Sequence, residues 1–258
     1  QWKEIIKRCR KRKIQFMCSV FSEKSLFNLV KMGVKNIKIP SGELTNIFLL
    51  KKVNKFRNIN LFVSTGMSRW SEINYALKIL KLKKITLMQC TSLYPCPPEK
   101  AGINVISEMK NKYKRKYKYG FSDHTQGSEA AVLAMSFGAK VFEKHLTFST
   151  KMYGSDAKFA MEPHEFSQYV QSLKKTHKIL KNQVNKDKFK LGNNMKKVFE
   201  KKIILNFSKK KGHVIKEKDL ILRKSKDGLF ASQIDEILGK KLKKSLKSKS
   251  PIKKNFLY

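Results

Sequence analysis

Residues 121–147 read FSDHTQGSEAAVLAMSFGAKVFEKHLT and hold two of the chain's five histidines. Each histidine follows a short apolar or aromatic run and comes directly after a charged residue: Asp123 precedes His124, and Lys144 precedes His145. Two such runs, separated by a helix-sized segment, are typical of parallel strands joined by a helix. The stretch therefore predicts two successive strands that each end in a histidine.

The same rhythm extends back through the chain. The segments between the apolar runs, such as SEKSLFNLVKMG, place apolar residues at the helical spacing i, i+3, i+4 and i+7. Alternating strands and helices predict a parallel sheet with helices outside, either a TIM-type (β/α) barrel or a doubly wound sheet. No G-x-G-x-x-G follows a strand, which counts against a dinucleotide-binding fold. The predicted strands lie at 14–20, 36–41, 61–65, 85–91, 117–124 and 140–147.

Every predicted strand ends in polar side chains that can bind a ligand. Barrel enzymes place their chemistry at this C-terminal end of the strands. Hydroxyls and glycines also mark ordinary turns, but six such ends in succession favour a functional site. The polar residues are Ser19, Ser41, Glu43, Ser64, Thr65, Thr91, Ser92, Tyr94, Ser122, Asp123, His124, His145 and Thr147.

Six strands do not close an eight-stranded barrel. The chain opens in an amphipathic segment, WKEIIKRCRKR, that should follow a strand, so we expect two βα units to be absent before it. We expect the partial barrel to cover 1–180, a polar linker 181–200, and a small β-rich domain 201–258. Within that domain the sequence predicts a helix over SQIDEILGKK and a last strand over KSLKSKSPIKKNFL.

The formal net charge of +39 raises the alternative of a basic protein that binds polyanions. Only seven of the 58 basic residues are Arg, and lysines occur in nearly every segment, so a composition-wide lysine bias explains the charge better. No stretch approaches the roughly 18 apolar residues of a membrane span, and the first residues given, QWKEIIKRCRKRK, lack the apolar region of a signal peptide. We expect a cytoplasmic location and, since the four cysteines lack paired spacing, reduced thiols.

Two neutral imidazoles on adjacent strand ends can hold one divalent metal and leave its other positions to water and substrate. Such an open site suits Mn²⁺ or Mg²⁺, whereas catalytic zinc normally has three protein ligands. The alternative is a pair of core histidines satisfied by hydrogen bonds. A metal-dependent hydrolase or aldolase would use the same histidines, but it would need a third ligand or a Schiff-base lysine, for which no segment supplies a clear case.

Seven segments form a combination that is more specific than any one of them. They are IKIPSGELTNIFLL, LFVSTGMSRWSEI, LMQCTSLYPCP, YGFSDHTQGSEAAVLAMSFGA, FEKHLTFSTKMYGSDAKFAMEPHEF and, in the last domain, KKGHVIKEKDL and DEILGKKL. Together they resemble the sialic acid synthase family, whose members make N-acetylneuraminate, legionaminate or pseudaminate. The resemblance implies a TIM-type barrel followed by an antifreeze-like (SAF, β-clip) domain, and condensation of phosphoenolpyruvate with an N-acetylmannosamine-like sugar, releasing phosphate.

The resemblance also implies roles for individual residues. His124 and His145 match the two metal ligands, the metal typically being manganese, and are catalytic together with Glu43. Phosphate-side contacts match Lys38, Ser41, Ser64 and Ser122, with Ser19 where the family more often has Thr. Contacts near the acceptor sugar match Glu43, Tyr94 and Asp156, with Ser92 where some members have Asn.

Two turns depart from the family pattern. The family's G-P-D-H turn reads Gly154-Ser155-Asp156-Ala157 here, and the K-R-P-G turn of the last domain reads Arg223-Lys224-Ser225-Lys226. The second change puts Lys224 where an arginine reaches the sugar of a partner subunit in a homodimer with swapped C-terminal domains. Lysine keeps that charge but loses the planar fork of arginine. A catalytically inactive, truncated remnant of the family therefore remains an alternative.

Overall fold

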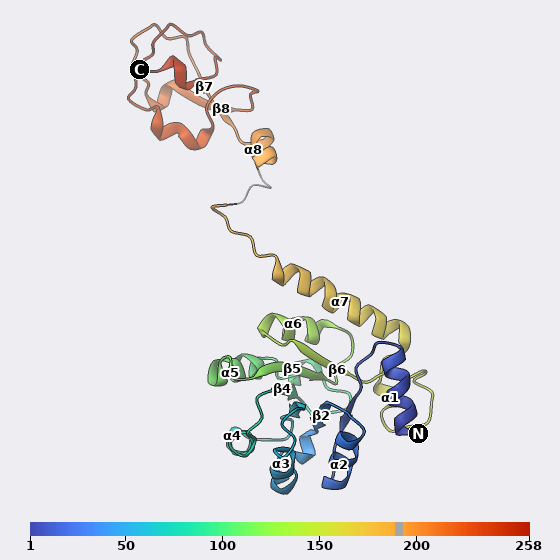
Figure 1. The fold of residues 1–258 in the computed structure, drawn as a ribbon. Coiled ribbons are helices and arrows are strands. Elements are labelled where there is room, and N and C mark those ends of the chain that lie inside the picture. Colours follow the sequence, from blue (N-terminus) through green and yellow to red (C-terminus); the bar gives the residue numbers. More distant parts are fainter. Residues whose placement is uncertain (189–192) are drawn as a thin grey trace. The chain divides into compact units, whose positions relative to one another are not determined.

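A computed structural model describes residues 1–188 and 193–258. The chain divides into two compact units, Gln1–Gln183 and Val184–Tyr258, which are described separately (Figure 1). The expected linker over 181–200 includes residues 189–192, which lie outside the described part. No helix in the described residues is long and apolar enough to cross a membrane.

The first unit is a six-stranded parallel sheet in simple chain order, with helices covering its outer face (Figure 1). The strands are β1 (Met17–Ser19), β2 (Asn36–Ile39), β3 (Asn60–Ser64), β4 (Ile85–Cys90), β5 (Lys118–Asp123) and β6 (Val141–Lys144). The helices are α1 (Trp2–Lys11), α2 (Glu23–Lys31), α3 (Ile47–Val53), α4 (Trp70–Ile79), α5 (Asn104–Tyr113), α6 (Glu129–Phe137) and α7 (Pro163–Lys181). This is the curled half-barrel of a TIM-type fold.

Alternation along each strand separates a core face from an inner face. Ile37 and Ile39 on β2 are fully buried in the main hydrophobic core, because successive side chains of a strand point to opposite faces. Lys38, between them, instead forms an ion pair with Glu143 of β6. Since β2 and β6 are four places apart in the sheet, this contact shows how strongly the sheet curls.

The second unit is built around an antiparallel pair, β7 (Lys202–Leu205) and β8 (Leu220–Arg223), preceded by α8 (Asn193–Phe199). Its core is formed by Ile203, Leu205, Ile215, Ile237, Leu242, Leu246, Ile252 and Leu257.

Two local expectations for this unit were wrong. The helix expected over 232–241 is a six-residue 3-10 segment, Ala231–Glu236, interrupted by non-helical backbone at Gln233. The last strand, expected over 244–257, forms only isolated bridges within its range, because it ends in a 3-10 turn at Lys254–Phe256 and contains Pro251, which has no amide hydrogen to donate.

Candidate active site

The polar residues predicted at the strand ends gather at the C-terminal edge of the half-barrel. Ser19, Ser64 and Ser122 lie in or at the end of β1, β3 and β5. Ser41 and Glu43 form a 3-10 turn after β2, Ser92 and Tyr94 lie in the loop after β4, and His124 and His145 directly follow β5 and β6. Parallel strands bring these ends together at one edge of the sheet.

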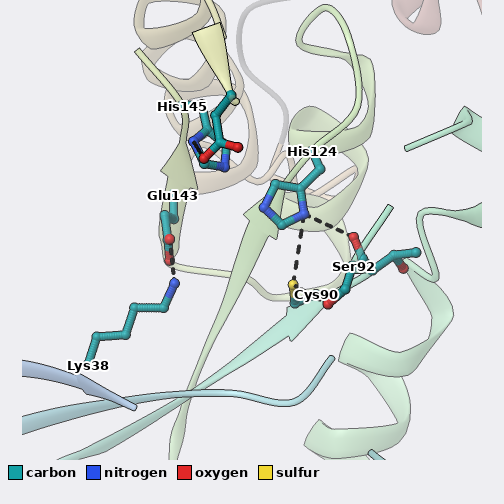
Figure 2. Close-up of polar contacts among 8 residues, drawn as sticks. Lys38, Cys90, Ser92, His124, Glu143 and His145 are labelled. Carbon is teal, nitrogen blue, oxygen red and sulfur yellow. Dashed lines mark hydrogen bonds and ion pairs between the residues drawn. The ribbon is translucent and has the colours of Figure 1, made fainter. Parts of the chain in front are cut away.

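His124 and His145 lie side by side, with ring centroids 5.3 Å apart (Figure 2). The register of β5 and β6 explains this proximity, because Asp123 pairs with Lys144 and the next residue on each chain is a histidine. Tyr94 packs against both rings, at 4.2 Å from the centroid of His124 and 5.9 Å from that of His145. The three rings form one aromatic and imidazole cluster at the C-terminal edge of the half-barrel, here called the mouth.

The orientation of the His124 ring is held by the backbone. Its Nδ1 lies 2.9 Å from the carbonyl oxygen of Thr91. A carbonyl can only accept, so Nδ1 carries the hydrogen and Nε2 keeps the lone pair that a metal needs. The amide of Cys96 also donates to the carbonyl of His124, at 2.8 Å. A backbone carbonyl on the second nitrogen is the usual partner of a metal-binding histidine.

The surroundings shift the pKa values of this cluster in different directions. Burial lowers the pKa of His145, and the nearby His124 adds to the effect. Burial also works to lower the pKa of His124, but its contacts with Cys90 and the Thr91 carbonyl outweigh burial and raise it. The Cys90 sulfur is the more distant of these two partners, 3.9 Å from Nδ1.

Below the histidines, Lys38 of β2 and Glu143 of β6 face each other across the inner side of the sheet (Figure 2). Nearby strand ends supply hydroxyls, and Ser64 Oγ is buried with no hydrogen-bond partner among the described residues. A buried hydroxyl without a partner is uncommon and is satisfied when a ligand or water oxygen binds it. A Cβ at Gly66 would lie 2.7 Å from both Ser41 Oγ and Ser92 Oγ, so glycine lets these two hydroxyls keep their positions.

The remaining predicted residues lie in segments after β2 and β6 or in the second unit. Glu43 accepts a hydrogen bond from Asn46 Nδ2 at 2.7 Å. Asp156, in the loop after β6, has Oδ2 3.8 Å from His145 Nδ1 and is largely exposed. Lys224 belongs to the second unit, where its Nζ lies 5.2 Å from the ring centroid of Phe199.

The sequence pattern did not single out Glu143, Cys90 or Lys144 as parts of the site. Glu143 and Cys90 contact predicted site residues, and Asp123 and Lys144 form a buried ion pair beneath the two histidines. Strand alternation carries a signal for Glu143, since it lies two positions before His145 and therefore on the same face.

The two histidines fit a divalent cation with an open coordination shell. In the described part of the chain no group of three or more His, Cys, Asp or Glu side chains is arranged to hold a metal, and the two imidazoles are the pair of donors that could serve here. The tautomer that the Thr91 carbonyl selects leaves His124 Nε2 as the donor.

Comparisons with known proteins agree with this architecture. The model of the NeuB family matches residues 1–185, and that of the SAF domain matches residues 210–257. The N,N'-diacetyllegionaminic acid synthase of Campylobacter jejuni is 33% identical over 250 residues, covering 95% of this chain and 74% of that protein. The pseudaminic acid synthase of Helicobacter pylori is 27% identical, covering 96% and 73%.

A solved structure agrees as well. The N-acetylneuraminic acid synthetase of Leptospira borgpetersenii, in complex with citrate, superposes with a TM-score of 0.69 at 30% identity, covering 75% of this chain and 67% of that one. The family match spans the strand ends that carry both histidines, and the second match lies within the second unit. The chain therefore belongs to the NeuB family of sialic acid synthases and carries a C-terminal SAF domain.

Proposed function

We propose that this chain is a nonulosonic acid synthase that joins phosphoenolpyruvate to an N-acylated mannosamine-like sugar and releases phosphate. The observation that carries the proposal is the pair of imidazoles 5.3 Å apart, above a lysine and a ring of hydroxyls at the strand ends. C3 of phosphoenolpyruvate bonds to the aldehyde carbon of the open-chain sugar, water adds at C2, and the C–O bond to phosphate breaks.

Phosphoenolpyruvate binds on the inner face of the sheet. Lys38 Nζ donates to its anionic oxygens, and the hydroxyls of Ser19, Ser41, Ser64 and Ser122 supply further donors. Lys38 has only 13% of its side chain exposed and forms an ion pair with Glu143. Its ammonium group is therefore already oriented toward the inner face, where the anion would bind. Charge-assisted hydrogen bonds of this kind are stronger than neutral ones.

The acceptor sugar lies above the histidines. Tyr94 supplies an aromatic face, Asp156 and Ser92 bond to hydroxyl and acetamido groups, and Glu43 is the carboxylate that orients the reacting end. When bound by His124 and His145, Mn²⁺ or Mg²⁺ supplies Lewis-acid polarisation of the sugar aldehyde. The protein's own part is to hold the two imidazoles side by side, with the Thr91 carbonyl leaving His124 Nε2 free to bind.

We further propose a homodimer in which the SAF domain of each subunit closes the barrel of the other and offers Lys224 to the bound sugar. The C-terminal unit is small, and domains of this size bury too little surface to be very stable alone. The large hydrophobic side chains exposed after the barrel strands, Phe21, Met67, Leu146 and Phe148, would be covered by this arrangement.

The test is phosphate release by the purified chain with phosphoenolpyruvate, Mn²⁺ and a panel of sugars. The panel contains N-acetylmannosamine and its 6-deoxy and diacetamido relatives, with the diacetamido sugar first because a relative is named for a diacetylated product. We expect sugar-dependent phosphate release together with an equimolar new 2-keto acid. Phosphate release that does not depend on any sugar, or none at all, would contradict the proposal.

A further inference from the structure

The residues that precede the two histidines form a buried ion pair. Lys144 Nζ lies 3.1 Å from Asp123 Oδ2, and the two side chains are 3% and 0% exposed. Asp123 and Lys144 are direct partners in the register of β5 and β6. Because side chains alternate along a strand, this pair points to the face opposite that of the histidines, toward the helices. There the ring of Tyr169 of α7 covers it, with its centroid 5.5 Å from Lys144 Nζ.

The same two side chains also hold the backbone that follows His124. Asp123 Oδ1 accepts hydrogen bonds from the amide and the hydroxyl of Thr125, at 2.9 and 2.7 Å. Lys144 Nζ donates to the carbonyl of Thr125. Lys144, which immediately precedes His145, therefore contacts the residues on both sides of His124: Asp123 before it and Thr125 after it.

Stability alone gives little reason to bury such a pair, because well-packed apolar residues of similar volume are often as stabilising as a buried ion pair. An ion pair with defined partners does fix the register and direction of the segments that it joins. Here those segments are the ends of β5 and β6, and each continues directly into a histidine.

We propose that the Asp123–Lys144 pair positions His124 and His145 to bind one divalent cation. This inference rests on the proposed function only in assigning the cation to the two histidines. Asp123 and Lys144 are positioning residues, since they face away from the mouth and act through the imidazoles. Removing either one lets the two strand ends move independently, so the site loses affinity for the metal before the chain loses its fold.

Binding of Mn²⁺ alone to the full chain tests the proposal, with free Mn²⁺ followed by its electron paramagnetic resonance signal. Lys144→Met and Asp123→Asn should each weaken Mn²⁺ binding about 10–100-fold, the range for partners that orient metal ligands. Leu61→Ala is the matched control, because Leu61 is fully buried on β3, a strand that pairs with β2 and β4 and with neither histidine-bearing strand. It should lower thermal stability and leave Mn²⁺ affinity within about twofold of the unmodified chain.

The double variant Asp123→Asn, Lys144→Met separates positioning from stability, and it also carries the test if a single variant does not fold. It should regain thermal stability, since no unpaired charge stays buried, and still bind Mn²⁺ weakly, because the contact from residue 144 to the Thr125 carbonyl is gone. Recovery of both properties would overturn the proposal, as would Lys144→Met binding Mn²⁺ as tightly as Leu61→Ala. If His124→Ala and His145→Ala leave Mn²⁺ binding unchanged, the metal site itself is refuted.

Discussion

Two buried carboxylates, Asp123 in the barrel and Asp219 in the SAF domain, both face a lysine but lie in different surroundings. Asp219 is 2% exposed. It accepts from Lys209 Nζ at 2.8 Å, His213 Nε2 at 2.7 Å and the Lys216 amide at 3.0 Å. Asp123 contacts Thr125 and Lys144, and the residue that follows it, His124, lies at the mouth.

The difference shows how the two units use buried polar groups. Around Asp219 every contact comes from a residue close in sequence, so the cluster stabilises the local fold of the small domain. The ion pair of Asp123, by contrast, is followed on both strands by a partly exposed histidine, His124 or His145. Ser64 Oγ in the same barrel stays buried without a partner in the described residues. A buried hydroxyl without a partner is expected where a ligand completes the structure.

The largest effect should follow from removing an imidazole at the mouth. We expect His124→Ala to lower sugar-dependent phosphate release about a thousandfold or more, equivalent to about 4 kcal/mol of transition-state stabilisation. His177→Ala, on the exposed side of α7, is the matched control and should be silent. Equal activities for the two variants would remove the histidine pair from the reaction.

In the SAF domain the corresponding change should affect stability and leave the barrel intact. Asp219→Asn leaves Lys209 and His213 without their carboxylate, and breaking a buried pair in this way costs about 3 kcal/mol when one partner can turn to solvent. Amide hydrogen exchange should become faster in β7 and β8 and stay unchanged in β4 and β5. Faster exchange in both units would show that they unfold together.

The strand ends could be predicted from the sequence because apolar runs and the polar residues that end them are local features. The pairing of Lys38 with Glu143 could not, since the two residues are 105 positions apart and meet only because the sheet curls. Bridges such as Ile204 with Pro251 also depend on tertiary contacts, so a strand-like pattern in the SAF domain predicted more regular structure than forms. Asp123 and Lys144 were visible beside the histidines, but their burial depends on α7.

The next expected effect is that lowering the pH reduces the stability of the SAF domain through Asp219, an effect that the barrel does not share. Burial alone would raise the pKa of Asp219, but the hydrogen bonds from His213, Lys209 and the Lys216 amide outweigh it and hold that pKa well below its usual range. The resulting stabilisation is complete above the unfolded pKa of about 3.9 and is lost as the pH falls further toward the folded pKa.

Both tryptophans, Trp2 and Trp70, lie in the barrel unit. Between pH 4 and 2 the SAF contribution to circular dichroism should therefore decrease along with its stability. In Asp219→Asn this dependence should be smaller, while the dependence of tryptophan fluorescence on pH should match that of the unmodified chain. An unchanged acid transition in that variant would show that Asp219 does not set it.

The smallest effect concerns Lys38, the lysine that we propose binds the phosphate. Lys38→Ala should weaken phosphoenolpyruvate binding about 10–100-fold, because a hydrogen bond to a charged group contributes about 1.5–3 kcal/mol, whereas Lys112→Ala should change it by less than about twofold. Lys38→Ala also leaves the Glu143 carboxylate without its partner, and that charge would repel the ligand. The double variant Lys38→Ala, Glu143→Gln removes this repulsion. Calorimetry that shows full recovery in the double variant would mean that Lys38 only neutralises Glu143, whereas a residual loss would assign Lys38 a direct contact with the anion.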